Sequence, residues 1–263
     1  MQIGGASVLL TGASGGIGHA LARELAARGA RLTLTGRRAD VLEAVAGELG
    51  AHVIAADLSV RSEVARLAQE AGETDILVAN AGVPAAGRLE SFDAEELDRT
   101  LEVNLYSPIA LTRALLPEML ERGRGHLVFM SSIAGKTTVP GNPLYHATKY
   151  GLRGFAAALR TDLHGSGVGA SCIFPGFIRD AGIFAESGVK LPPGVGTRSP
   201  ADVARAVVAA IERDRGEIDV ASFPQRAGAR IANLAPDFAA RVARRAGSVQ
   251  IAEQMDAALR DKR

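Results

Sequence analysis

A glycine-rich turn between a strand pattern and a helix pattern constrains this chain more than any other feature. The apolar run at residues 6–11 leads directly into GASGGIG at residues 12–18, and a helix pattern follows over residues 17–28. Glycine lets the backbone approach another group closely, and the first turn of a helix presents free N–H groups to anions. The pattern predicts a dinucleotide phosphate site, although Gly12 and Gly16 are one residue further apart than in GxGxxG. A turn that binds no ligand is the alternative.

The rest of the chain alternates between short apolar runs and helix patterns. Strands that are almost continuously apolar belong to parallel sheets covered by helices on both faces. The sequence therefore predicts an α/β fold with right-handed connections and with ligands beyond the carboxyl ends of the strands. Strands are expected at residues 6–11, 31–35, 52–56, 76–79, 125–130, 169–174 and 217–221, and helices at 17–28, 39–49, 61–71, 94–122, 143–164 and 200–213.

Composition narrows the classes of protein that fit. A chain of 263 residues, 47% of them hydrophobic, can bury one large core. Its 30 basic and 29 acidic residues give no signal for a nucleic-acid partner. Cys172 is the one cysteine, which excludes an internal disulfide, and no clustered ligand pattern predicts a metal site. The sequence shows no signal peptide and no apolar stretch of about 20 residues, so we expect a cytoplasmic protein.

Tyr145 and Lys149 lie four residues apart in a helix pattern, and Ser132 precedes Tyr145 by thirteen residues. A tyrosine has an ordinary pKa of about 10, and an ammonium group on the same helix face lowers that pKa. A serine hydroxyl beside the tyrosine would hold a carbonyl or alcohol oxygen, which suits proton transfer to and from that oxygen. YxxxK alone is a weak signal, and a local hydrogen bond at a strand end is the alternative role for Ser132.

Six motifs occur together along the chain, in one order. They are TGASGGIG at residues 11–18, Asn80-Ala81-Gly82, Asn104 in VNL, Ser132 in SSIAG, Tyr145 with Lys149, and Pro175-Gly176. With these motifs the chain resembles the short-chain dehydrogenases/reductases, in their single-domain branch, over roughly residues 6–221. The resemblance implies a doubly wound, seven-stranded parallel sheet of the Rossmann type and assembly as a homodimer or homotetramer.

The same resemblance implies an oxidoreductase that moves hydride between nicotinamide C4 and a carbonyl or secondary alcohol. Tyr145 would exchange the oxygen proton, and Ser132 would orient and polarise the oxygen. Lys149 would lower the tyrosine pKa and bind the nicotinamide ribose, while Asn104 would support a water that links Lys149 to solvent. An NADP(H)-binding regulator with little turnover is the alternative. The presence of all four catalytic residues of the family, Asn104, Ser132, Tyr145 and Lys149, argues against it. A membrane-peripheral scaffold is a third class.

Two arginines follow the second strand, where an acidic residue would bind the adenosine ribose of NAD(H). Arg37 and Arg38 would instead pair with a 2′-phosphate, so the sequence favours NADP(H) over NAD(H). Asp57 matches the adenine-binding position of the family, with capping of a helix from Val60 as its alternative role. The residues expected to contact the cofactor are Gly12, Ser14, Gly15, Gly16, Ile17, Gly18, Arg37, Arg38, Asp57, Leu58, Asn80, Ala81, Gly82, Tyr145, Lys149, Pro175, Gly176 and Ile178.

Asp180 departs from the family pattern, which often has a threonine here to contact the nicotinamide carboxamide. A carboxylate can accept from the carboxamide NH2 but cannot donate to its carbonyl oxygen. Capping of a short helix over residues 181–187 is the alternative role. Residues 177–198 are expected to form the substrate lid, and their apolar side chains suit a lipophilic ketone, aldehyde or alcohol.

Residues 223–263 extend the chain beyond the expected catalytic domain at residues 1–222. Pro224 and Pro236 are expected to divide the extension into helical pieces, and eight basic residues outnumber four acidic ones. Peripheral contact with an anionic membrane is one interpretation. Packing across the active site or at a subunit interface is favoured, because the apolar side chains are scattered and include no tryptophan.

Overall fold

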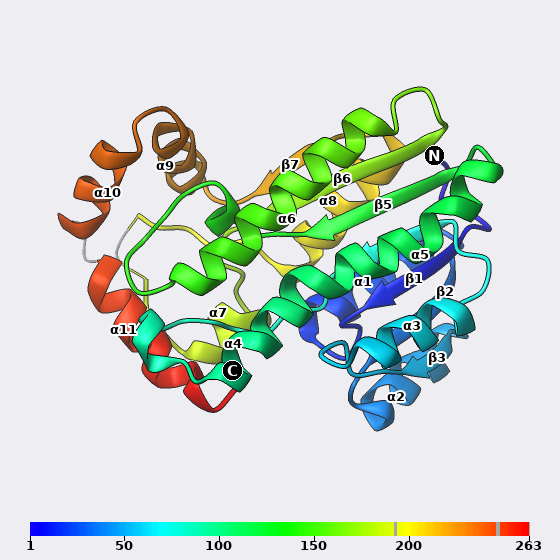
Figure 1. The fold of residues 1–263 in the computed structure, drawn as a ribbon, viewed down its shortest axis with the longest axis horizontal. Helices are drawn as coiled ribbons and strands as arrows, with labels where there is room; N and C mark the ends of the chain where they lie inside the picture. Colours follow the sequence, from blue (N-terminus) through cyan, green and yellow to red (C-terminus); the bar gives the residue numbers. More distant parts are fainter. Residues whose placement is uncertain (192–193, 246–247, 263) are drawn as a thin grey trace.

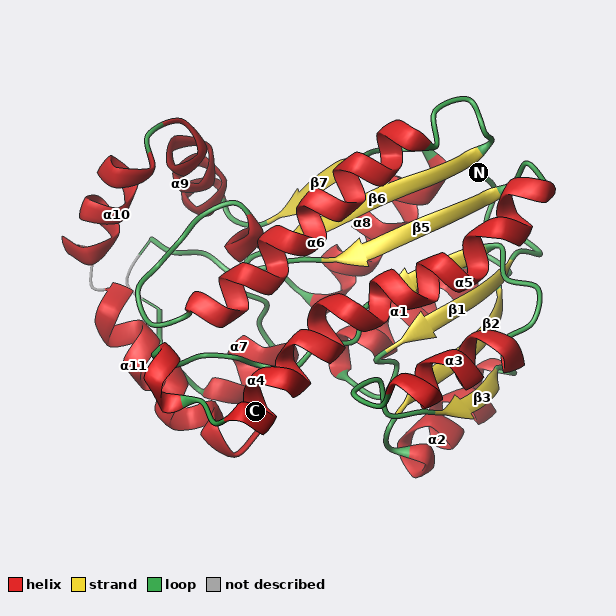
Figure 2. Cartoon of the chain, viewed as in Figure 1, coloured by secondary structure: helices red, strands yellow, loops and turns green. Residues whose placement is uncertain are grey.

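Seven parallel strands form one sheet in the order β3-β2-β1-β4-β5-β6-β7. This computed structural model describes residues 1–191, 194–245 and 248–262. The strand order reverses between β1 and β4, so the predicted doubly wound α/β fold is confirmed (Figures 1 and 2). The strands are β1 (Ser7–Thr11), β2 (Arg31–Gly36), β3 (His52–Ala55), β4 (Ile76–Ala79), β5 (Gly125–Met130), β6 (Val168–Pro175) and β7 (Glu217–Val220).

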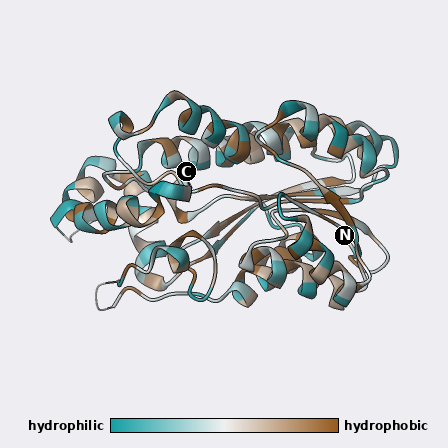
Figure 3. Cartoon of the chain, turned by 90° about the horizontal axis from the view of Figure 1, so that it is seen from below, coloured by the Kyte–Doolittle hydropathy of each residue, from teal (hydrophilic) through white to brown (hydrophobic). Residues whose placement is uncertain are grey.

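Helices cover both faces of the sheet, because buried strands present apolar side chains to each face in turn. In β1, Leu10 belongs to the core on one face and Leu9 to the core on the other. Figure 3 shows the hydrophobic strands between two layers of helices. One layer contains α1 (Gly16–Ala27), α2 (Ala39–Leu49) and α8 (Pro200–Glu212), and the other contains α3 (Arg61–Glu70), α5 (Ser107–Glu121) and α6 (Pro143–Asp162).

The single helix expected at residues 94–122 has three parts. It starts as α4 (Ala94–Leu101), where Asp93 and Glu96 form a capping box. A π-helical turn follows at Glu102–Tyr106, and α5 then continues to Glu121. Pro108 lies in the first turn of α5, directly after the π-helical turn. Proline has no backbone N–H to donate, and the first turn of a helix is the place where a helix tolerates it. The wider turn contains Asn104.

The C-terminal extension forms three helices, α9 (Phe223–Leu234), α10 (Pro236–Arg245) and α11 (Ser248–Leu259). Pro224 lies in the first turn of α9 and does not interrupt a helix, whereas Pro236 begins α10. Figure 1 shows α9 and α10 at the end of the molecule farthest from α2, and α11 beside the short helix α7 (Gly182–Ser187). The extension therefore packs against the segment expected to be the substrate lid, of which residues 192–193 lie outside the described residues.

Candidate active site

The glycine-rich turn follows β1 and requires glycine at two positions. Gly12 has a φ of +65°, and a Cβ there would lie 2.8 Å from the Cα of Ala81. A Cβ on Gly18 would lie 2.2 Å from the carbonyl oxygen of Gly12. Gly15 precedes α1 with no side-chain cap, so the first turn of the helix is open to an anion. The turn therefore fits a nucleotide phosphate.

The loop after β4 is tied to the end of β1. The Thr11 hydroxyl accepts from the backbone N–H groups of Asn80 and Ala81, both at 3.0 Å, and the Asn80 amide donates to the Thr11 carbonyl at 3.0 Å. A Cβ on Gly82 would lie 3.2 Å from Asn104 Oδ1 and 3.7 Å from Lys149 Nζ. The loop after β4 therefore carries Asn80, Ala81 and Gly82 from the glycine-rich turn toward Asn104 and Lys149.

Ser132, Tyr145 and Lys149 meet where β5 ends and α6 begins. Ser132 Oγ donates to the carbonyl of Pro175 at 3.3 Å and accepts from the N–H of Ala134 at 3.2 Å. The Ser132 hydroxyl is also close enough to Tyr145 to lower the pKa of the phenol. Lys149 Nζ donates to the carbonyl of Met130 at 3.0 Å and lies 5.5 Å from the centre of the Tyr145 ring. The fold thus brings these three predicted side chains together, with Asn104 behind Gly82.

The two titratable groups of this cluster shift in opposite senses. Burial raises the pKa of Tyr145, and the hydrogen bond with Ser132 opposes that rise. Burial lowers the pKa of Lys149 to about 8. The expected lowering of the tyrosine pKa by Lys149 is not seen in the chain alone. Desolvation of the buried phenol raises the pKa instead and outweighs the effect of Ser132. The Lys149 ammonium donates to the Met130 carbonyl rather than to the phenol.

Arg37 and Arg38 lie at the carboxyl end of β2, and both are exposed. The Arg38 guanidinium donates to the carbonyl of Ser14, which places it against the glycine-rich turn. Asp57 follows β3, and its Oδ1 accepts from the backbone N–H and the hydroxyl of Ser59 at 2.9 and 2.7 Å. Burial opposes ionisation of Asp57, but the Ser59 bonds and the charge of Arg37 hold its pKa below the ordinary value.

The capping role considered for Asp57 is wrong, because α3 begins at Arg61 after Val60 and has no side-chain cap. The carboxylate instead closes a turn of its own with Ser59, as short acidic side chains often do outside helices. Leu58 is buried among the apolar side chains under α3 and α5. Asp57 therefore remains available to a ligand only through the oxygen that Ser59 does not occupy.

The segment after β6 is held together at its two ends and contacts the glycine-rich turn. Ile178 is buried and pairs with Arg198 in a parallel bridge, which joins the two ends of the expected lid. A Cβ on Gly16 would lie 2.5 Å from the Cβ of Ala181, so the residue before α7 contacts the glycine-rich turn. On the lid itself, the rings of Phe177 and Phe184 pack 4.7 Å apart.

Asp180 does not cap α7, so this alternative is also wrong. The helix begins at Gly182 after Ala181, and Asp180 lies before it with a φ of +68°. Aspartate tolerates this left-handed conformation better than most residues do. Its exposed carboxylate lies 3.5 Å from the Arg179 guanidinium. This contact does not identify Asp180 as a group that binds the nicotinamide carboxamide.

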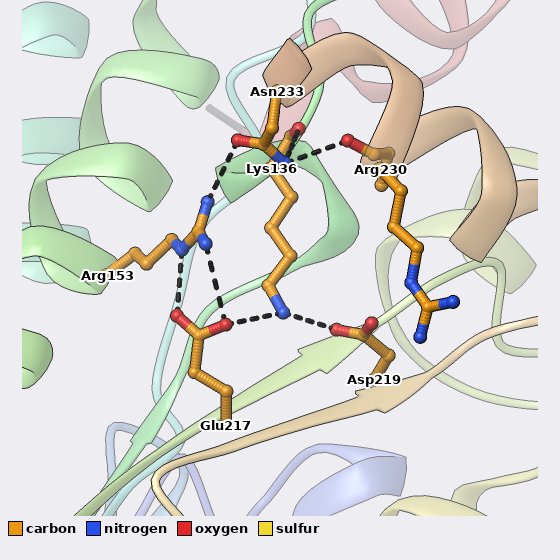
Figure 4. Close-up of a pocket in the computed structure, with 7 residues that line it drawn as sticks. Lys136, Arg153, Glu217, Asp219, Arg230 and Asn233 are labelled. Atoms are coloured by element: carbon orange, nitrogen blue, oxygen red, sulfur yellow. Dashed lines mark hydrogen bonds and ion pairs between the residues drawn. The ribbon is translucent and has the colours of Figure 1, made fainter.

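Figure 4 draws a charged cluster around Lys136 that was not expected from the sequence. Lys136 Nζ lies 2.7 Å from Glu217 and 2.6 Å from Asp219, and 3.8 Å from the centre of the Phe174 ring. Arg153 of α6 reaches the same Glu217 at 2.8 Å. The acidic residues are two apart on β7, so they share one face of the strand. That spacing is a signal in the sequence, but nothing local connects it to Lys136.

The charged cluster also joins the catalytic segment to the C-terminal extension. Asn233 of α9 donates to the carbonyl of Lys136 at 3.2 Å, and Arg153 donates to Asn233 Oδ1 at 3.3 Å. The side chains line a pocket between β7, α6 and α9 (Figure 4). In the described part of the chain, no three His, Cys, Asp or Glu side chains gather as metal ligands would.

Comparisons with known proteins match this architecture. The family model for short chain dehydrogenases matches residues 6–189. Ketoacyl reductase HetN of Nostoc sp. is 36% identical over 229 residues, covering 84% of this chain and 80% of HetN. Dehydrogenase/reductase SDR family member 7B of Bos taurus is 32% identical over 253 residues, covering 88% of this chain and 78% of that protein. A short-chain dehydrogenase from Sphingobium yanoikuyae in complex with NADPH has a TM-score of 0.74 at 28% identity, covering 81% and 87% of the two chains.

Fold, cluster geometry and relatives together define an oxidoreductase that acts on CH–OH or C=O groups with a nicotinamide cofactor. Within that class, the chain belongs to the short-chain dehydrogenase family, because the family model covers most of its length. The likeness that the six motifs predicted is thereby confirmed. None of the described helices is both long and apolar enough to cross a membrane.

Proposed function

We propose that this protein is an NADP(H)-dependent carbonyl reductase or alcohol dehydrogenase that uses Tyr145 as its general acid and base. One arrangement carries the proposal: the Ser132 hydroxyl is close enough to Tyr145 to lower the phenol pKa, and the Lys149 ammonium lies over the tyrosine ring. A substrate oxygen that lies between the Ser132 and Tyr145 hydroxyl groups would accept a hydrogen bond from each of them. The loop after β4 connects the two parts of the site, because Asn80 is bonded to the end of β1 and Gly82 lies beside Lys149.

The roles of the four residues follow from their contacts. In reduction, Tyr145 donates a proton to the carbonyl oxygen, and its raised pKa keeps the hydroxyl protonated until then. Ser132 orients that oxygen and donates to it as negative charge develops. Lys149 supplies positive charge beside the phenolate that remains, and Asn104 fixes the loop beside Lys149. When bound, the nicotinamide supplies or takes the hydride. The glycine-rich turn would hold the phosphates of the cofactor, and Arg37 and Arg38 would hold its 2′-phosphate.

The preference for NADP(H) rests on charge at the end of β2. Arg37 and Arg38 are both exposed there, and neither forms an ion pair with another described residue. Two such guanidinium groups can bind a 2′-phosphate through charge-assisted and often bidentate hydrogen bonds. Arg38 is held against the glycine-rich turn by Ser14, so it approaches the ligand from the turn side. The relative from Sphingobium yanoikuyae, which was crystallised with NADPH, supports the same choice.

A lipophilic substrate is the class that the lid supports. Phe177, Ile183, Phe184 and Val189 are partly buried apolar side chains between β6 and α8. The lid begins two residues after Pro175, whose carbonyl lies 3.3 Å from Ser132 Oγ, and apolar side chains in such a segment suit a ketone, aldehyde or alcohol with a hydrocarbon body. Reductases of ketoacyl groups occur among the relatives by name, as HetN illustrates.

Turnover with a panel of ketones and aldehydes of graded chain length tests the proposal, with NADPH and NADH as alternative reductants. We expect NADPH-specific turnover that Tyr145→Phe reduces by about 10²- to 10⁴-fold, while NADPH binding persists. Tyr150→Phe is the matched control, because Tyr150 lies on the same helix with its side chain exposed. Tight NADPH binding without turnover on any substrate would favour the regulator, and full activity of Tyr145→Phe would exclude the acid–base role.

A further inference from the structure

Exposed large hydrophobic side chains gather on α9 and α10. Elsewhere in the described chain such residues occur singly on separate elements, as Val60, Leu89 and Leu120 do. Isolated exposed apolar residues are normal, whereas a group of them on adjacent helices indicates a contact surface. The group, called here the tail face, is Phe223, Ile231 and Leu234 of α9 and Phe238 and Val242 of α10, with exposed fractions of 74%, 45%, 87%, 53% and 49%.

Helix geometry places these side chains on one side of each helix. Phe223, Ile231 and Leu234 are spaced eight and three residues apart, which puts them on one side of α9. Ala229, the buried residue of that helix, lies on the other side. On α10, Phe238 and Val242 are four residues apart and share a side in the same way.

The opposite side of α9 is attached to the catalytic domain. Asn233 donates to the Lys136 carbonyl at 3.2 Å, and Gln225 donates to the Gly196 carbonyl at 3.2 Å. These contacts fix the orientation of α9, so its apolar side points away from the sheet. Figure 1 shows α9 and α10 at the margin of the molecule, where a flat surface can reach them.

Positive charge accompanies the apolar side chains. Residues 223–245 contain five arginines and one acidic residue, Asp237. Arg241, Arg244 and Arg245 are exposed, and none of them forms an ion pair with another described residue. Arg241 follows Phe238 by three residues and Arg245 follows Val242 by three, so both flank the apolar side of α10.

We propose that the tail face docks on an anionic phospholipid surface. The apolar side chains of α9 and α10 enter the interfacial region, and the arginines of α10 pair with lipid phosphates. A second copy of the chain fits this face poorly. Two-fold pairing through these helices would bring the arginines of both α10 helices together, and α9 and α10 contribute one acidic residue per copy, Asp237, to offset them. The inference does not depend on the proposed substrate or cofactor.

Co-sedimentation of the full-length chain with vesicles tests the proposal. Vesicles of phosphatidylcholine alone are compared with vesicles that also contain phosphatidylglycerol, at low and high salt. We expect binding to the anionic vesicles that weakens with salt. The double variant Leu234→Ser/Phe238→Ser and the triple variant Arg241→Glu/Arg244→Glu/Arg245→Glu should each reduce partitioning by at least about tenfold. Leu89→Ser/Leu120→Ser, two exposed leucines elsewhere, should bind as the natural chain does.

Three results overturn the proposal. The first is that the chain does not sediment with anionic vesicles. The second is that it sediments equally with both kinds of vesicle and that the triple arginine variant sediments as the natural chain does. The third is a dimer in sedimentation velocity that Leu234→Ser/Phe238→Ser dissociates, which would make the tail face a subunit interface. Circular dichroism of each variant confirms that it is folded, and all changed side chains are exposed.

Discussion

The Asn104 amide holds both backbone polar groups of Val83. Its Oδ1 accepts from the Val83 N–H at 2.8 Å, and its Nδ2 donates to the Val83 carbonyl at 3.0 Å. Asn104 is buried in the π-helical turn between α4 and α5, so this contact clamps the loop after β4 to that turn. Gly82, the neighbour of Val83, leaves room for the Asn104 oxygen and the Lys149 ammonium.

Asn104→Ala should destabilise the protein as well as impair it. The change leaves the buried N–H and carbonyl of Val83 unpaired, and each such group costs about 1–3 kcal/mol. We expect a fall in unfolding free energy of about 2 kcal/mol or more, measured by urea denaturation. Asn142→Ala is the control, because the Asn142 side chain makes no capping bond to α6. Equal stability of the two variants would show that the clamp contributes nothing.

Arg37→Ala should change cofactor selection more than stability. Losing one charge-assisted contact with a 2′-phosphate should raise the KM for NADPH by about 10- to 100-fold, with little effect on NADH. Steady-state kinetics with both cofactors measures the ratio. Arg31→Ala is the matched control, since Arg31 is exposed at the opposite end of the same strand. An unchanged ratio for Arg37→Ala would remove the argument for a phosphate site.

The strands of the sheet were predictable because their signal is local. Most are short apolar or β-branched runs before a turn, and each strand end agrees with its predicted position to within one residue. The gathering of Ser132, Tyr145 and Lys149 was predictable for a different reason. Parallel strands end at one edge of a sheet, so motifs that follow β5 and begin α6 must meet there.

The features that the sequence did not reveal depend on contacts between distant segments. The Lys136 ion pairs join residues about 80 positions apart, and no local pattern marks that distance. The π-helical turn adds one residue to a helix, and this changes the spacing of the apolar residues too little for the sequence to reveal it. The left-handed backbone of Asp180 lies in the chain path between β6 and α7, and no neighbouring sequence pattern marks it. Tertiary structure decides each of these.

Gly18→Ala and Gly15→Ala should differ sharply in stability although both lie in one turn. A methyl group on Gly18 would meet the Gly12 carbonyl at 2.2 Å, so the turn must shift, at a cost of about 1–3 kcal/mol. On Gly15 the nearest atom would be 3.6 Å away, an ordinary contact at a φ of −92°. Thermal unfolding should show a lower Tm for Gly18→Ala alone. Equal Tm values would mean that the turn adapts freely.

His126 is a buried histidine whose tautomer follows from its partner. Its Nε2 lies 2.8 Å from Ser171 Oγ, and the Ser171 hydroxyl donates its single proton to the Arg215 carbonyl at 2.7 Å. Nε2 must therefore carry the hydrogen and donate to the serine. Burial of the ring lowers the pKa of His126 to about 4, because a charged imidazole would lose its hydration.

His126 should therefore make the protein less stable as pH falls from 6.5 to about 4. In that window the unfolded chain binds a proton that the folded chain refuses, so the unfolding free energy falls by up to about 1.4 kcal/mol per pH unit. His126→Gln keeps an N–H donor for Ser171 without a titrating ring, and its stability should decline less over the same window. His52→Gln, at an exposed histidine, is the control and should follow the natural chain. Urea denaturation at a series of pH values measures all three, and parallel curves for His126→Gln and the natural chain would contradict the assignment.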